Sequence, residues 1–272
     1  MNATLEIDGR TWKVDLGRPL DISIPLDFRG AQPNAYGVPP ATAQAYEDAH
    51  FVGDTRRGGS CNFETCRLIP HCNGTHTECV GHISYERISV HTILQDTLVP
   101  ATLVTVASTP AGETGDTYRP PKNQADRLVT REALQTALSD AEMGFLQALV
   151  IRTLPNDPAK RVRRYLEAPA PYFSVEAMQL IVGRDVQHLL VDLPSVDRAF
   201  DEGRLTAHHL FWQVPEGGHD VDPARGSRKT ITEMIYVPDE IPDGRYVLNL
   251  QIPDFVADAA PSRVRLFRVQ EI

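Results

Sequence analysis

The centre of the chain alternates between strand and helix patterns. The segment at residues 148–153, ALVIRT, predicts a strand, and residues 188–193 predict another. Between them, Ser174 is a suitable N-cap for a helix over residues 175–182. A strand, a helix and a second strand in this order form a βαβ unit, whose two strands lie parallel in one sheet. We therefore predict an α/β fold whose sheet is at least partly parallel.

The two ends of the chain add further strands to this prediction. Residues 4–7 and 12–16 alternate between apolar and polar side chains on either side of Asp8-Gly9, which favours a hairpin. In the final third, strands are predicted at residues 230–237, 245–252 and 264–269, with Asp243-Gly244 as the turn between the first two. The short connections there predict an antiparallel tail.

Other segments complete an expected single domain. Aliphatic and β-branched residues dominate 90–106, which predicts buried strand, and Thr130 can cap a helix over 131–138. Residues 30–59 and 118–124 have loop composition. Because no linker divides the chain, we expect residues 1–272 to form one α/β domain, with a mixed β-sheet flanked by helices.

Composition and charge restrict the expected partners. The net charge of −9 argues against nucleic acid and anionic membranes, which need a basic surface. The N-terminus lacks the apolar core of a signal peptide, and no apolar run approaches membrane-spanning length. We expect a cytoplasmic protein, in which thiols stay reduced.

Residues 71–82, HCNGTHTECVGH, concentrate metal-ligand side chains. Three of the nine histidines and two of the four cysteines lie within these twelve residues, together with one glutamate. In an extended segment Cys72, His76, Glu78 and His82 project from one face, whereas His71 should point away unless the segment bulges by one residue. Cys72 can join His76 only if the chain bends, which Gly74 permits. The group predicts a metal or catalytic site, and a nucleophilic Cys72 with a histidine base is the alternative.

The same segment resembles a family motif. Residues 74–82, GTHTECVGH, are similar to the pattern H-x-G-T-H-x-D-x-P-x-H of the cyclase family of metal-dependent hydrolases, which includes bacterial kynurenine formamidases and isatin hydrolase. Gly74, Thr75, His76 and His82 match the pattern. Three positions depart from it, with Cys72 in place of the first histidine, Glu78 in place of aspartate and Val80 in place of proline.

The resemblance continues in order along the chain. Residues 21–26, DISIPL, resemble the family's D-L-S-x-P-L segment, and residues 191–197, VDLPSVD, its G-I-D-T-x-S-x-D element. Residues 207–210 resemble its later histidine segment, and residues 231–235, ITEMI, its I-x-E-x-L segment. The matches cover the chain from about residue 20 to the C-terminus. They imply the family's swivelling β/β/α-like architecture.

Carried over by position, the resemblance implies a metal centre. Cys72, His76 and Glu78 would hold one ion, and Glu78, His208 and Glu233 a second, with His82 transferring protons. His209 is the alternative to His208, because the two are adjacent. One or two zinc ions are expected, since a thiolate ligand favours zinc, and manganese is the alternative.

This centre implies hydrolysis of an amide, formamide or ester bond in a small molecule, with arylformamide cleavage as the default. The sequence has no G-x-S-x-G motif to support a serine hydrolase. Because three motif positions differ, a non-catalytic descendant that binds a metal or small ligand is the alternative. The resemblance also implies a homo-oligomer, a dimer or a tetramer.

Overall fold

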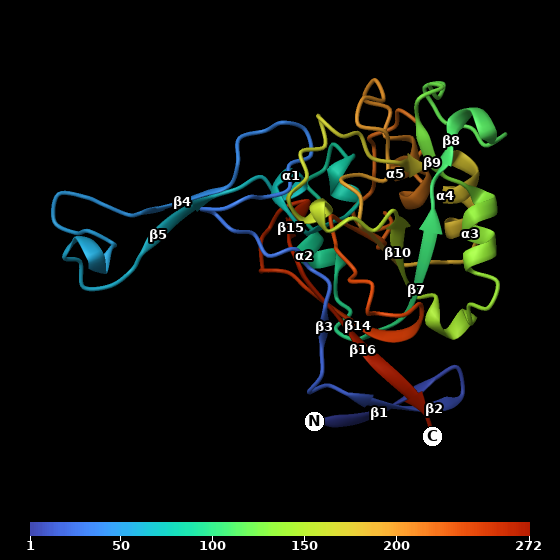
Figure 1. The fold of residues 1–272 in the computed structure, drawn as a ribbon, viewed down its shortest axis with the longest axis horizontal. Helices are drawn as coiled ribbons and strands as arrows, with labels where there is room; N and C mark the ends of the chain where they lie inside the picture. The colour runs from blue at the N-terminus through green and yellow to red at the C-terminus, as the bar shows by residue number, and fades with distance from the viewer.

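A mixed eleven-stranded sheet runs through the body of the protein, and the computed structural model describes all residues from 1 to 272 (Figure 1). The strands follow the order β1 (Asn2–Ile7), β2 (Arg10–Asp15), β16 (Arg263–Glu271), β14 (Gly244–Gln251), β7 (Val99–Ala107), β10 (Ala148–Leu154), β12 (His188–Val191), β13 (Thr230–Glu233), β6 (His76–Glu78) and β15 (Ala259–Pro261), with β3 (Leu20–Asp21) beside β16. β7, β10, β12 and β13 are parallel, and the other pairs are antiparallel. The predicted mixed α/β architecture is confirmed.

Both faces of the parallel strands are buried. Along β10, Leu149 and Ile151 join a core cluster with residues of α3 (Arg131–Ala137), α4 (Val175–Gly183) and α5 (Thr206–Trp212). Ala148 and Val150 join a second cluster with β14 and β16 on the opposite face. This two-sided burial explains why residues 148–151 are all apolar.

The predicted helix starts are confirmed. The Thr130 side chain accepts a hydrogen bond from the Ala133 amide at 3.3 Å, and Ser174 accepts one from Ala177 at 3.0 Å. Each cap satisfies an amide that has no partner within the first turn of its helix. The N-terminal hairpin is also confirmed, with Asp8 and Gly9 both in the left-handed region that its tight turn requires.

Two strand predictions are wrong in part. Residues 90–106 begin as a helical turn, α2 (Val90–Ile93), before β7 starts at Val99. Asp243-Gly244 does not join β13 to β14 in a hairpin, because β13 pairs with β12 and β6. β13 ends at Glu233, since Met234 has a left-handed φ of 53° that takes the chain out of the strand. The antiparallel tail exists between β14 and β16.

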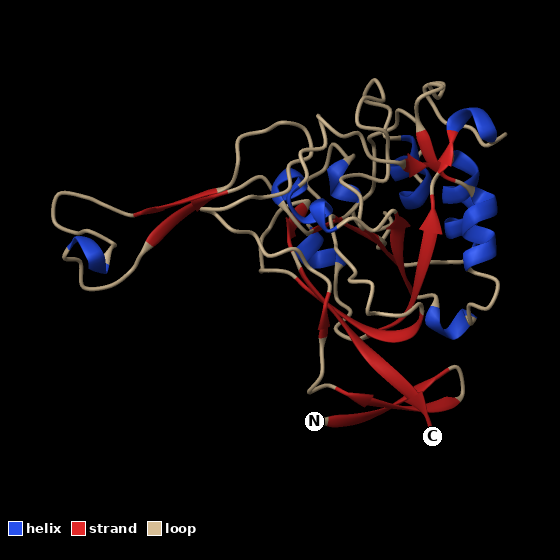
Figure 2. Cartoon of the chain, in the orientation of Figure 1, coloured by secondary structure: helices blue, strands red, loops and turns tan.

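A hairpin arm projects from the body (Figures 1 and 2). It consists of β4 (Thr42–Ala45) and β5 (Glu64–Arg67), with η1 (Thr55–Arg57) near its tip, so part of the predicted loop 30–59 is strand. All four residues of β5 are exposed. A separate three-stranded sheet contains β8 (Thr109–Pro110), β9 (Arg127–Val129) and β11 (Tyr172–Phe173). None of the helices is long and apolar enough to span a bilayer.

A buried ion pair joins the carboxyl ends of two parallel strands. Lys160 donates to Asp192, which follows β12, at 2.8 Å, and to the Thr153 hydroxyl of β10 at 2.9 Å. Asp192 also accepts hydrogen bonds from the amide and hydroxyl of Thr153. Lys160 and Asp192 are almost fully buried, so neither charge has water to replace its partner.

Replacing Lys160 by Met should leave the Asp192 carboxylate buried without a counter-charge. We expect the free energy of unfolding to fall by about 3–5 kcal/mol, measured by chemical denaturation. Arg164→Met is the matched control, because Arg164 pairs with Glu167 on the surface, where such pairs contribute less than about 1 kcal/mol. Equal losses in the two variants would contradict a structural role for the buried pair.

Candidate metal centre

The centre begins on the short strand β6. His76 and Glu78 are two residues apart there, so their side chains leave the same face of the strand, as predicted. His76 is fully buried, and its Nδ1 lies 3.0 Å from the Gly74 carbonyl oxygen. Because a carbonyl can only accept, Nδ1 carries a proton, and in the neutral ring Nε2 presents a lone pair.

That lone pair has no hydrogen-bond partner. His76 Nε2 is a buried atom without a donor, and it faces Glu233 Oε2 at 3.5 Å. The Nε2 lone pair of a neutral imidazole and a carboxylate oxygen repel each other in a buried site unless a cation lies between them. Their arrangement fits a metal ion, whose histidine ligands commonly donate their second nitrogen to a carbonyl, as Nδ1 does here.

Glu233 is held in place by the sheet. The pairing of β13 with β6 sets Glu233 opposite His76, although the two residues are far apart in sequence. Glu233 Oε1 accepts a hydrogen bond from the Val196 amide at 2.9 Å. One carboxylate oxygen is therefore fixed by the backbone, and Oε2 remains for the centre.

His208 reaches the same centre from α5. Its Nε2 lies 2.8 Å from Glu78 Oε1 and 3.8 Å from Glu233 Oε1, while its Nδ1 lies 2.5 Å from Asp197 Oδ2. His209 is also buried, but its ring lies 6.0 Å from that of His219, and its Nδ1 has no partner. The structure brings His208 to Glu78 and places His209 outside this group.

Glu78 lies at the middle of the histidines. Burial acts to raise the pKa of its carboxyl, but the electrostatic interactions with His82 and His208 outweigh burial and hold the pKa well below its usual range. Glu78 Oε2 lies 3.0 Å from His71 Nδ1 and 3.9 Å from His82 Nε2. The two oxygens of the Glu78 carboxylate thus face different histidines, so each oxygen could bind a separate metal ion.

The expectation that His71 points away is wrong. Residues Pro70–Asn73 form a helical turn, α1, that Pro70 starts, so the two-residue alternation of a strand does not apply to them. His71 contacts Glu78 and also lies 2.9 Å from Asp258 Oδ2. Burial acts to lower the His71 pKa, but the hydrogen bonds to Asp258 and Glu78 outweigh it and raise the pKa to about 10.

Cys72 is buried on the same turn. Its Sγ belongs to none of the groups of three or more ligand atoms that lie within 4.8 Å of one another. Burial, followed by the charge of Glu233, raises the pKa of its thiol to about 11. The groups that do form are His71, His76 and Glu78; Glu78, His82 and His208; and His71, His82 and Asp258.

Sequence reasoning missed Asp258. The residue precedes β15, whose pairing with β6 sets Ala259 opposite Glu78 and so carries Asp258 to the edge of the centre. Asp258 Oδ2 lies 3.4 Å from His82 Nδ1, in addition to its contact with His71. Hydrogen bonds from the two histidines hold the pKa of Asp258 well below its usual range. No local spacing signals this residue, because sheet pairing alone brings it here.

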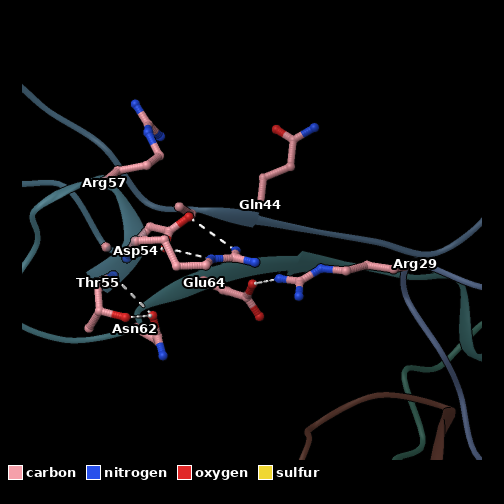
Figure 3. Close-up of a pocket in the computed structure, with 10 residues that line it drawn as sticks. Arg29, Gln44, Asp54, Thr55, Arg57, Asn62 and Glu64 are labelled. Atoms are coloured by element: carbon pink, nitrogen blue, oxygen red, sulfur yellow. Dashed lines mark hydrogen bonds and ion pairs between the residues drawn. The ribbon is translucent and has the colours of Figure 1, made fainter.

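A cavity of about 640 Å³ lies away from this centre, on the hairpin arm (Figure 3). Its lining includes Arg29, Arg56 and Arg57, but none of the candidate ligands. Each of these arginines pairs with a carboxylate, of Glu64, Asp54 and Glu47 respectively. The charges of these arginines are therefore neutralised by neighbouring carboxylates, and the arm cavity is separate from the histidine cluster.

Comparisons with known proteins agree with this arrangement. Residues 14–198 match the family model described as "Putative cyclase", and no curated protein matches the sequence. An isatin hydrolase bound to the product analogue thioisatinate is 13% identical, with a TM-score of 0.60 over 93% of each chain. Isatin hydrolase A from Labrenzia aggregata, bound to benzyl benzoate, is 19% identical, with a TM-score of 0.59 over 92% of this chain and 93% of its own.

A predicted metal-dependent hydrolase from Bacillus stearothermophilus is 15% identical, with a TM-score of 0.56 over 92% of this chain and 98% of its own. At these identities the solved structures establish a shared fold. The family model covers more than half of the sequence and includes the segment that carries His76 and Glu78.

Removing His208 or Glu233 should weaken metal binding without unfolding the protein. We expect His208→Ala and Glu233→Ala to hold less zinc per chain than the wild type after dialysis, measured by atomic emission, with circular dichroism unchanged. His209→Ala is the matched control, since it removes the adjacent buried imidazole. The opposite order, with His209→Ala losing more zinc than His208→Ala, would move the ligand by one residue.

Proposed function

This chain belongs to the cyclase family, and we propose that it is a metal-dependent hydrolase that cleaves an amide, formamide or ester bond of a small molecule. The observation that carries the proposal is the unpartnered His76 Nε2, which faces the Glu233 carboxylate in a buried cluster with Glu78 and His208. The hydrolase names of the structural neighbours support the same reaction class. Arylformamides, as for kynurenine formamidases, are the first substrates to test.

The proposed ligands are His76, Glu78, His208 and Glu233, joined by His71. His71 replaces Cys72 in this proposal, because a ring nitrogen of His71 groups with the ligand atoms of His76 and Glu78 within 4.8 Å, whereas Cys72 belongs to none of the groups of three or more. Imidazole and carboxylate ligands suit one or two zinc ions, with manganese as the alternative. A bound divalent ion would supply a water of lowered pKa and polarise the scissile carbonyl.

His82 is the proposed proton carrier. It lies at the edge of the cluster and keeps 27% of its side chain exposed, so it is open to substrate. Asp258 accepts from Nδ1 at 3.4 Å, which leaves the Nε2 lone pair turned towards Glu78. In this arrangement His82 Nε2 takes a proton from the attacking water and delivers it to the leaving nitrogen or oxygen. The Asp258 carboxylate stabilises the imidazolium that forms between the two steps.

Two rival functions have specific tests. A non-catalytic descendant is motivated by Cys72 and Glu78, which replace the motif's histidine and aspartate, and it predicts metal binding without turnover. A thiol mechanism needs a Cys72 thiolate, and burial opposes it by raising the thiol pKa to about 11. Activity that survives complete metal removal would favour the thiol mechanism over the hydrolase proposed here.

We also propose that the protein forms a homo-oligomer, a dimer or a tetramer, through the hairpin arm. An isolated two-stranded hairpin is only marginally stable in water, and β5 is exposed along its whole length. Tyr46, Phe51 and Phe63 form an aromatic cluster beyond the strands, and Phe63 keeps 55% of its surface exposed. Packing of arms between copies would cover these rings.

Replacing His82 by Ala should keep the metal and remove most turnover. Loss of a general base lowers the rate about 10²–10⁴-fold. The measurements are kcat on a panel of formamides, lactams and esters, and zinc content by atomic emission. His91→Ala is the matched control, because His91 is a histidine that pairs with Asp254 away from the cluster. Wild-type turnover in His82→Ala would assign the base elsewhere.

The choice between His71 and Cys72 has its own test. Loss of a residue that supports a metal ligand weakens metal affinity ~10–100-fold, and we expect His71→Ala to weaken zinc binding by at least as much. We expect Cys72→Ser to change zinc affinity little. Zinc affinity is measured by competition with a chromophoric chelator. If Cys72→Ser loses more affinity than His71→Ala, the thiolate predicted from the sequence is the ligand.

A further inference from the structure

A row of buried hydrogen bonds extends from the metal centre towards the three-stranded sheet of β8, β9 and β11. Tyr118 donates its hydroxyl to Asp197 Oδ1 at 2.6 Å, and Asp197 Oδ2 lies 2.5 Å from His208 Nδ1. His208 Nε2 lies 2.8 Å from Glu78. Tyr118, Asp197 and His208 are each no more than 4% exposed. Water therefore cannot substitute for any member of the row.

Asp197 has no freedom to turn within this row. Its Oδ1 accepts from the Ala207 amide at 2.6 Å as well as from Tyr118, and its Oδ2 accepts from the His208 amide at 3.1 Å as well as from the ring. The two amides belong to the first turn of α5, whose early N–H groups have no partner within the helix. The same carboxylate thus holds both the start of α5 and the side chain of His208.

The partners of Asp197 also fix the orientation of His208. An ionised carboxylate only accepts hydrogen bonds, so the proton between it and His208 belongs to Nδ1. Nε2 is then the nitrogen that faces Glu78 and Glu233. Histidine ligands whose second nitrogen donates to a carboxylate bind metals more tightly than unsupported ones.

Of the groups that donate hydrogen bonds to the Asp197 carboxylate, only the Tyr118 hydroxyl comes from outside α5. It lies in the loop after η3 (Ala111–Glu113), and its ring packs on Tyr172 of β11 with centroids 4.6 Å apart. Its hydroxyl also accepts from the Arg198 amide at 3.1 Å. Tyr118 therefore connects the small sheet that contains β11 to Asp197, beside a backbone hydrogen bond from the Phe173 amide of β11 to the Val196 carbonyl.

We infer that Tyr118 is a positioning residue for the metal centre, which sets the affinity for the ion by holding Asp197 against His208. The inference rests on the proposed metal site, but it does not depend on which bond the protein cleaves. Without the phenol, Asp197 Oδ1 keeps only its helix amide, and the carboxylate can tilt away from the imidazole. His208 then loses the support that aims its Nε2.

The test compares Tyr118→Phe with Tyr172→Phe. Both changes remove one hydroxyl from the same pair of packed tyrosine rings, but the Tyr172 hydroxyl donates to Asp126 and not to Asp197. Each protein is stripped of metal and titrated with zinc against a chromophoric chelator. We expect Tyr118→Phe to bind zinc about tenfold or more weakly than the wild type, at the lower end of the range for such supporting residues, and Tyr172→Phe to bind normally.

A double-mutant cycle separates positioning from general destabilisation. If Tyr118 acts through His208, Tyr118→Phe should have no further effect on zinc affinity when His208 is already Ala. Equal zinc affinity in Tyr118→Phe and the wild type would overturn the inference, as would a loss that persists in the His208→Ala background. Wild-type protein that binds zinc but hydrolyses nothing would refute the proposed function and leave the inference standing. Wild-type protein that binds no zinc would overturn both.

Discussion

The candidate centre depends on the antiparallel pairing of three-residue strand β6 with β13. The pairing places Glu233 opposite His76, and the pairing of β15 with the same strand brings Asp258 to its edge. A slip of one residue in β6 would turn His76 and Glu78 to the other face of the sheet. The parallel strand β12 lies on the far side of β13 and leads into the segment that holds Asp197. The register of the sheet thus decides which side chains meet at the site.

The cluster gathers charges that a protein interior does not tolerate without partners. Glu78 and Glu233 are buried with His76 and His208, and the partly exposed residues His71, His82 and Asp258 lie beside them. With no ion present, a protonated His71 supplies positive charge to Glu78 and Asp258. A metal needs neutral imidazole, so binding would exchange that proton for the ion. The proton on His71 and the metal ion would therefore compete to neutralise the carboxylates of the cluster.

Local patterns in the sequence predicted local structure well. The caps at Thr130 and Ser174 marked two helix starts, and the alternation at His76 and Glu78 placed both on one face of a strand. The same alternation failed for His71, because it assumes an extended chain and Pro70 begins a helical turn. The strand predicted at residues 230–237 is also too long, because β13 ends at Glu233, where a left-handed Met234 takes the chain out of the sheet. Asp258 and Tyr118 carry no local signal, since only tertiary pairing brings them to the site.

The central claim is that His76, Glu78, His208 and Glu233, joined by His71, hold one or two divalent ions while His82 stays free. Anomalous scattering at the zinc edge from zinc-loaded crystals tests it most directly. The account predicts an anomalous peak about 2.0–2.2 Å from His76 Nε2 and from a carboxylate oxygen of Glu78 or Glu233, with His82 beyond bonding distance. Fully loaded crystals with no peak among these side chains, or with a zinc ion bound to His82 instead, would contradict the account.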